Sequence, residues 1–145
     1  METENYDELC KEMDRLCSSV RAFVTDEDFE SSLDLIRKYM ARYPHSPQPH
    51  NLLAIVLEKT GKHYDAMKHF RAALALDPEY LPAQYNLYTY GTFFSRGNCA
   101  FDESDITSGF SGIKEIVYDS RNVGHAVYKN KIEYDENRIG HIVRK

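Results

Sequence analysis

Two amphipathic helical stretches meet at a single glycine between His50 and Pro78, and this feature constrains the fold more than any other. Before Gly61, apolar residues recur at steps of three and four, as they do along one face of a helix. After Gly61 a second stripe runs until Asp77 and Pro78 end it. Because glycine readily adopts the left-handed turn that closes a helix, the two helices are expected to pack antiparallel. The residues expected to face inward are Leu53, Val56 and Leu57, then Tyr64, Ala66, Met67, Phe70, Ala73 and Leu74.

The chain on either side of this stretch carries further helical stripes. Steps of three and four residues mark one stripe from Leu9 to Phe23 and another from Phe29 to Tyr43. After Pro78, the sequence LPAQYNLYTYGTFF begins one more helix, which is unusually aromatic. We therefore expect about five helices in residues 1–94.

A spacing of 34 residues links equivalent positions along these helices. Six pairs share it, which makes coincidence a poor explanation, and a repeat of this length is typical of stacked helix-turn-helix units. The pairs are Val20 and Ala54, Phe23 and Leu57, Ser32 and Ala66, Ile36 and Phe70, Met40 and Leu74, and Pro44 and Pro78.

In these positions the chain resembles the tetratricopeptide repeat family, whose units stack into a right-handed solenoid. The resemblance covers about residues 13–94 and is strongest in the central unit. His50 stands where the family usually has an aromatic residue, and the first unit lacks a glycine at its turn. The signature positions of the central unit are occupied by Leu53, Ala54, Gly61, Ala66, Phe70, Ala73 and Pro78.

The resemblance implies a concave groove, lined by the first helix of each unit, that holds a peptide or a partner's helix. Chaperone-binding members grip a C-terminal carboxylate with Lys, Arg and Asn at set groove positions. This chain has Cys17, Arg21, Asn51, Pro82 and Asn86 near those positions, so that ligand is not implied. The groove residues carried over from the family are Cys17, Arg21, Asn51, Ile55, Glu58, Lys59, Tyr85, Thr89, Thr92 and Phe93.

The aromatic residues of the last helix have a second interpretation. Tyr85, Tyr88 and Phe93 would then pack as core beneath the rest of the chain, since a tyrosine offers a large apolar area with a polar tip. In that case the protein's own tail partly fills the groove.

The pattern changes after Phe94. Residues 95–112 are rich in Gly, Ser and Asp and are expected to be a connection, with a helical turn beginning at Asp102. Period-two alternation in residues 113–145 then predicts a small antiparallel sheet or meander that packs on or caps the helices. The predicted fold class is therefore mostly α, in the α+β sense, and this tail resembles no family that we recognise.

Two predicted hairpins place His125, Tyr134 and His141 on one apolar face of this sheet. The hairpins pair Tyr128 with Lys131 and Asp135 with Arg138. Imidazole and phenol groups can transfer protons or bind metal, so the alternative function is a small catalytic, ligand-binding or metal-binding β unit. That face has no carboxylate, which favours hydrogen-bonded core histidines. We therefore expect no metal site, with His125 and His141 as the candidates if one exists.

Composition and motifs exclude several other classes of function. The net charge is −5, and no dense Lys/Arg cluster of the kind that binds nucleic acid is present. No apolar run approaches a membrane span, and the first residues do not resemble a secretion signal. The three cysteines lack disulfide or zinc spacing. We expect a cytoplasmic protein with reduced thiols.

Catalysis has little support from motifs, because no G-x-S-x-G, phosphate loop or H-E-x-x-H stretch occurs. The expected function is a non-enzymatic protein–protein interaction module, acting as an adaptor, co-chaperone or regulatory subunit without a cofactor. The expected partner is a protein or peptide. Because short repeat arrays expose an apolar end face, a homodimer is an alternative.

Overall fold

The computed structural model describes residues 2–92, 98–106 and 110, together with the backbone of four short strands. The chain divides into two compact units, Met1–Ile106 and Thr107–Lys145. The first unit is helical, and it includes part of the stretch that composition alone marks as a connection. Each unit is described separately.

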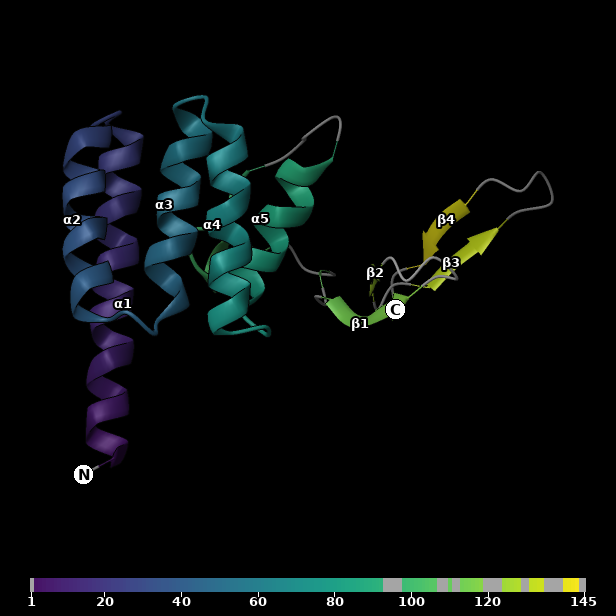
Figure 1. The fold of residues 1–145 in the computed structure, drawn as a ribbon, viewed down its shortest axis with the longest axis horizontal. Coiled ribbons are helices and arrows are strands. Elements are labelled where there is room, and N and C mark those ends of the chain that lie inside the picture. Colours follow the sequence, from purple (N-terminus) through teal and green to yellow (C-terminus); the bar gives the residue numbers. More distant parts are fainter. Residues whose placement is uncertain are drawn as a thin grey trace. The chain divides into compact units, whose positions relative to one another are not determined.

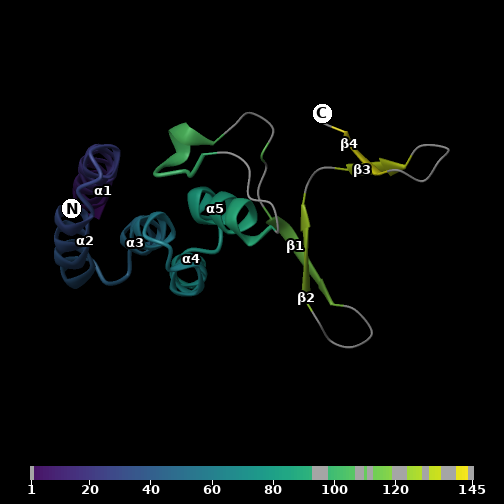
Figure 2. The ribbon, with the colours of Figure 1, turned by 90° about the horizontal axis from the view of Figure 1, so that it is seen from above.

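The first unit is built from five α-helices in two rows. α1 packs on α2 and on α3, α2 packs on α3, and α4 packs on both α3 and α5. Seen from above, α1, α3 and α5 gather along one side, with α2 and α4 along the other (Figure 2). A short 3₁₀ helix, η1, follows α5. The elements are α1 (Glu2–Thr25), α2 (Phe29–Arg42), α3 (Pro47–Lys59), α4 (His63–Leu76), α5 (Leu81–Gly91) and η1 (Glu103–Asp105) (Figure 1).

The turns inside the two helix pairs have the same geometry, one repeat apart. Gly61 has φ 82° and Glu27 has φ 58°, and both lie in the left-handed region. A Cβ added at Gly61 would meet nothing within 4 Å. The backbone therefore demands a left-handed residue at both turns, and only the second has the residue that adopts it without strain. In each turn a 2.8 Å hydrogen bond closes the helix, Asp28 N to Phe23 O in the first and Lys62 N to Leu57 O in the second.

The core lies between the two rows of helices. Small side chains permit close packing of α3 on α4, since Ala54 and Ala66 are both fully buried. Phe70 of α4 stacks on Tyr90 of α5 with ring centroids 6.0 Å apart. The fully or nearly fully buried apolar residues of this cluster are Leu16, Cys17, Val20, Ile36, Leu52, Ala54, Ile55, Val56, Ala66 and Phe70.

One residue of the predicted α4 stripe does not face inward. Tyr64 is 73% exposed, and the Lys68 ammonium lies 4.3 Å from the centroid of its ring. Tyr64 is the second residue of α4, and its ring contacts Lys68 of the same helix instead of entering the core. The prediction that it joins the core is wrong.

The predicted fold class, mostly α with one small antiparallel sheet or meander after the helices, is also wrong. The described residues of the first unit contain no strand, and the strands that follow do not join into one sheet. Instead they form two separate two-stranded ladders. The strands are β1 (Ile113–Tyr118), paired with β2 (Gly124–Tyr128), and β3 (Lys131–Tyr134), paired with β4 (Gly140–Val143).

The pairing also differs from the prediction. β2 does not pair with β3, so the hairpin that joined Tyr128 to Lys131 is absent. Within β3 and β4, His141 lies opposite Glu133, whereas pairing Asp135 with Arg138 would place it opposite Ile132. A shift of one residue moves alternate positions to the other face, so the predicted apolar face does not follow from the observed register.

None of the helices in the described ranges combines the length and apolar character needed to cross a lipid bilayer.

Candidate functional site

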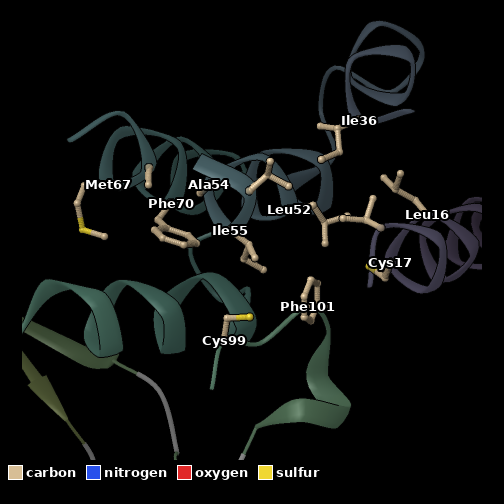
Figure 3. Close-up of a cluster of buried hydrophobic side chains, with 13 residues drawn as sticks. Leu16, Cys17, Ile36, Leu52, Ala54, Ile55, Met67, Phe70, Cys99 and Phe101 are labelled. Atoms are coloured by element: carbon tan, nitrogen blue, oxygen red, sulfur yellow. The ribbon is translucent and has the colours of Figure 1, made fainter. Parts of the chain in front are cut away.

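Residues 98–106, which we call the returning segment, lie along the side of the helical unit where α1, α3 and α5 gather (Figure 2). Three consecutive residues of this segment are buried: Cys99 is 6% exposed, Ala100 0% and Phe101 9%. Cys99 and Phe101 belong to the same core cluster as Leu16 and Ile55 (Figure 3). An irregular stretch of chain therefore contributes side chains to the core of the helical unit.

Two buried asparagines hold the backbone of the returning segment at Ala100. The Ala100 N–H donates to Asn86 Oδ1 at 2.7 Å, and Asn86 Nδ2 donates to the Ala100 carbonyl at 2.8 Å. Asn51 Nδ2 donates to the same carbonyl at 3.1 Å, and Asn51 Oδ1 accepts from Asn86 Nδ2 at 2.9 Å. Both side chains are fully buried. Because these contacts involve only main-chain groups of Ala100, they recognise an extended chain irrespective of that residue's side chain.

Arg21 of α1 holds the segment from the other end. Its guanidinium lies 2.6 Å from Asp105 Oδ1 and 3.1 Å from Asp102 Oδ2. It also lies 5.0 Å from the centroid of the Phe101 ring, within the range of a cation–π contact. Asp105 Oδ2 accepts from the Phe101 N–H at 2.9 Å. One arginine thus binds an aromatic ring and two carboxylates together. We call Cys17, Arg21, Asn51, Ile55 and Asn86 the α1–α3–α5 face.

Burial and hydrogen-bonding partners shift the pKa values of the ionisable groups at this contact. Burial alone would raise the pKa of Asp105, but hydrogen bonds from Arg21 and from the backbone N–H groups of Asp102 and Phe101 outweigh it, so the pKa is lowered. Burial, assisted by the Asp102 carboxylate, raises the pKa of the Cys17 thiol to about 12. Burial also raises the pKa of Cys99. Asp105 is therefore ionised at neutral pH, while both thiols are protonated.

Open cavities flank the returning segment on both sides. The larger, of about 650 Å³, runs beside Cys99 and Phe101 to Lys59 at the end of α3. The smaller, of about 290 Å³, lies between Cys17, Tyr80 and η1. The segment therefore occupies only part of the available surface on this side of the unit.

Four of the predicted groove residues meet at the returning segment: Cys17, Arg21, Asn51 and Ile55. The others have different environments. Lys59 lines the larger cavity, whereas Glu58 binds His63 Nδ1 at 2.9 Å at the α3–α4 turn. On α5, Thr89 is buried, Tyr85 is half-buried, and the Thr92 hydroxyl donates to the Thr89 carbonyl. Phe93 lies outside the described residues.

The sequence did not identify the returning segment as part of a site, and it placed Asn86 near the carboxylate-binding positions of the family without including it among the groove residues. The available signal was an apolar triplet, Cys99 to Phe101, followed by two aspartates within a Gly- and Ser-rich stretch. Its helical turn at Asp102 was predicted, and Asp102 is the N-cap of η1. Asn86 follows Asn51 by 35 residues, one more than the repeat. That offset removed it from the predicted groove positions.

A second polar contact lies between α3 and α4, where His50 Nδ1 and His69 Nδ1 are 3.2 Å apart and the rings stack at 5.5 Å. Burial lowers the pKa of both histidines. Charge repulsion from His69 lowers the pKa of His50 further, and the Lys68 ammonium lowers the pKa of His69. Asp65 acts in the opposite direction on His69. At neutral pH one ring donates and the other accepts.

The predicted candidates for catalysis or metal binding in the tail lie outside the residues whose side chains the structure describes. Only the backbone of His125, Tyr134 and His141 is described. Among the described residues, no group of three or more His, Cys, Asp or Glu side chains is arranged to hold a metal ion.

Comparisons of this chain with protein-family models, with curated proteins and with solved structures find no match.

Proposed function

We propose that this chain is a non-enzymatic protein–protein interaction module of the tetratricopeptide type, an adaptor, co-chaperone or regulatory subunit. Its α1–α3–α5 face binds an extended peptide segment of a partner. The observation that carries the proposal is the two-point clamp of the Asn86 carboxamide on the Ala100 N–H and carbonyl, assisted by Asn51.

Desolvation means that the two buried carboxamides need main-chain partners, which a bound peptide can supply. An unpaired buried carboxamide costs about 1–3 kcal/mol, and both asparagines are fully buried beneath the segment. Their donors and acceptors match a main-chain N–H and carbonyl on one extended residue. Main-chain hydrogen bonds provide affinity for any extended peptide, and neighbouring side-chain contacts provide specificity.

The repeat frame supports the same function. The face is formed by α1, α3 and α5, which are the first helices of the proposed units, and the equivalent turns at Glu27 and Gly61 share one geometry.

The free thiols of Cys10, Cys17 and Cys99 support a cytoplasmic location. Self-association through an exposed end of the array is an additional proposal that light scattering tests.

Peptide selection on the full-length chain tests the function. A random peptide library is selected on the Asp105→Asn variant, in which the returning segment loses one of its two charged contacts with Arg21. Selected peptides should bind at least roughly tenfold more weakly when Asn86→Ala is added. Addition of Asn5→Ala, an exposed asparagine on α1, should leave binding unchanged. Selected peptides that bind the Asn86→Ala protein equally well would contradict the proposal.

A further inference from the structure

We infer that the returning segment is an internal stand-in for the partner's peptide, so that its chemistry describes the partner. The partner segment is then extended, with a small residue, an aromatic residue and a carboxylate in succession, and a second carboxylate three residues later. It displaces the returning segment from the α1–α3–α5 face. This inference rests on the proposed function, because it specifies the peptide that the face selects.

The aromatic position is defined by its surroundings. Phe101 is 9% exposed and belongs to the same core cluster as Cys17 and Ile55 (Figure 3). The Arg21 guanidinium lies 5.0 Å from the centroid of its ring. A flat ring fills such a site and adds the cation–π contact, whereas a short aliphatic side chain loses both. The preceding residue, Ala100, is fully buried, which favours a small side chain there.

The acidic positions are defined by Arg21. Its two terminal nitrogens bind two different carboxylates, Asp102 and Asp105, whose side chains are 33% and 21% exposed. Charge-assisted contacts of this kind are stronger than neutral ones. A neutral or basic segment would leave the half-buried guanidinium without a counter-charge. Lys59 lines the larger cavity together with Arg21 and adds positive charge that can attract a further acidic residue of the partner.

The contacts of the returning segment suit exchange. It buries three consecutive side chains, and its other contacts are main-chain hydrogen bonds and ion pairs that any peptide of matching chemistry can replace. Open cavities on both sides give an incoming chain access. Its release is a local opening, which costs less than global unfolding. The apparent affinity for a partner is reduced by the fraction of molecules in the open state.

The test uses a fluorescein-labelled peptide with the sequence of residues 98–106, NCAFDESDI, and fluorescence polarisation on full-length protein under reducing conditions. Wild-type chain should bind it at least roughly tenfold more weakly than the Asp105→Asn variant, in which the internal competitor is weakened. Asp34→Asn, which changes an exposed carboxylate of α2, should match wild type. Phe101→Ala is a second opened variant.

Substituted peptides test the chemistry. Replacing the peptide's phenylalanine by alanine, or both aspartates by asparagine, should weaken binding to the opened variants at least roughly tenfold. Arg21→Gln in the Asp105→Asn background should abolish the preference for the aspartates. If Phe101→Ala does not unfold cooperatively, the isosteric Asp105→Asn variant decides the result.

Alkylation of the cysteines measures displacement of the returning segment without the fluorescein label. Cys17 lies under the returning segment and Cys99 within it, and both are buried, while Cys10 is exposed. Excess peptide in which serine replaces the cysteine, NSAFDESDI, should accelerate alkylation of Cys99 on the wild-type chain without changing that of Cys10. Unchanged Cys99 alkylation at peptide concentrations that saturate binding would overturn displacement.

The remaining outcomes separate this inference from the proposed function. If library peptides bind the opened face but NCAFDESDI binds no better than its substituted forms, the inference is wrong and the proposed function stands. If no peptide binds the opened face, the proposed function itself has failed. If opened variants become dimeric and exclude the peptide, the natural occupant is the segment of a second copy, which overturns the inference of a partner peptide.

Discussion

At the scale of single residues, the equivalent turn positions Glu27 and Gly61 provide opposite tests of the same backbone conformation. Gly61→Ala should destabilise the helical unit by about 1–2 kcal/mol, because an L-residue is strained in the left-handed region. Glu27→Gly should stabilise it by about 0.5–1 kcal/mol, since the relief of strain exceeds the greater entropy of glycine in the unfolded chain. Urea denaturation measures both. Shifts in the same direction would show that the two turns are not equivalent.

Asp105 provides a second test at this scale. Its pKa is lowered in the folded protein, so its ionised form stabilises the fold at every pH above its unfolded value of about 4. That stabilisation is lost as the pH falls through the lowered folded value. Asp105→Asn should therefore melt below wild type at neutral pH, and the difference should shrink in acid. A difference that stays constant down to about pH 2 would exclude ionisation of Asp105 as its source.

At the scale of elements, the sequence predicts the helices well for a physical reason. Each helix buries one side, so steps of three and four appear in Leu16 and Val20 of α1 and in Ala66, Phe70 and Ala73 of α4, all of which are buried. The returning segment has no such periodicity. Its burial depends on Asn51, Asn86 and Arg21, which lie 14 or more residues away in the chain, and a local pattern does not contain that information.

The contact between α3 and α4 should make stability depend on pH through His50 and His69. Both have lowered pKa values in the folded protein, so protonation is disfavoured relative to the unfolded chain. Stability is complete above the unfolded value of about 6.5 and decreases as the pH falls through the folded values. The melting temperature should therefore decrease between about pH 7 and about pH 5.

The matched variant for this prediction is His50→Phe, which keeps an aromatic ring beside His69. It removes one titrating ring and the like-charge contact with His69. The decrease in melting temperature should become smaller. An unchanged decrease in this variant would assign the pH dependence to groups other than this histidine pair.

At the scale of the whole molecule, the tail shows where sequence patterns stop being informative. Alternation identified period-two segments in residues 113–145, but it does not specify which strand pairs with which. β2 pairs with β1 rather than with β3. The pairing of β3 with β4 differs from the predicted register by one residue. Strands of four to six residues carry too few side chains to fix a register by pattern alone.

The limits of the helical unit lead to a prediction about truncated chains. A chain ending at Ile106 retains the whole first unit and should unfold cooperatively. A chain ending at Thr92 loses the buried Phe101 side chain, worth about 1.5–3 kcal/mol, and leaves Asn51 and Asn86 without their main-chain partner. Its unfolding free energy should be lower by several kcal/mol, as chemical denaturation will measure.

The shorter chain also allows the lost segment to be supplied from outside. Free peptide NCAFDESDI should raise its melting temperature in a concentration-dependent manner, because a ligand that binds only the folded state stabilises it by mass action. The same peptide with both aspartates replaced by asparagine should raise it less, since Arg21 then lacks its carboxylates. Equal stability of the two truncated chains would instead show that the returning segment lies on the α1–α3–α5 face without contributing to the fold.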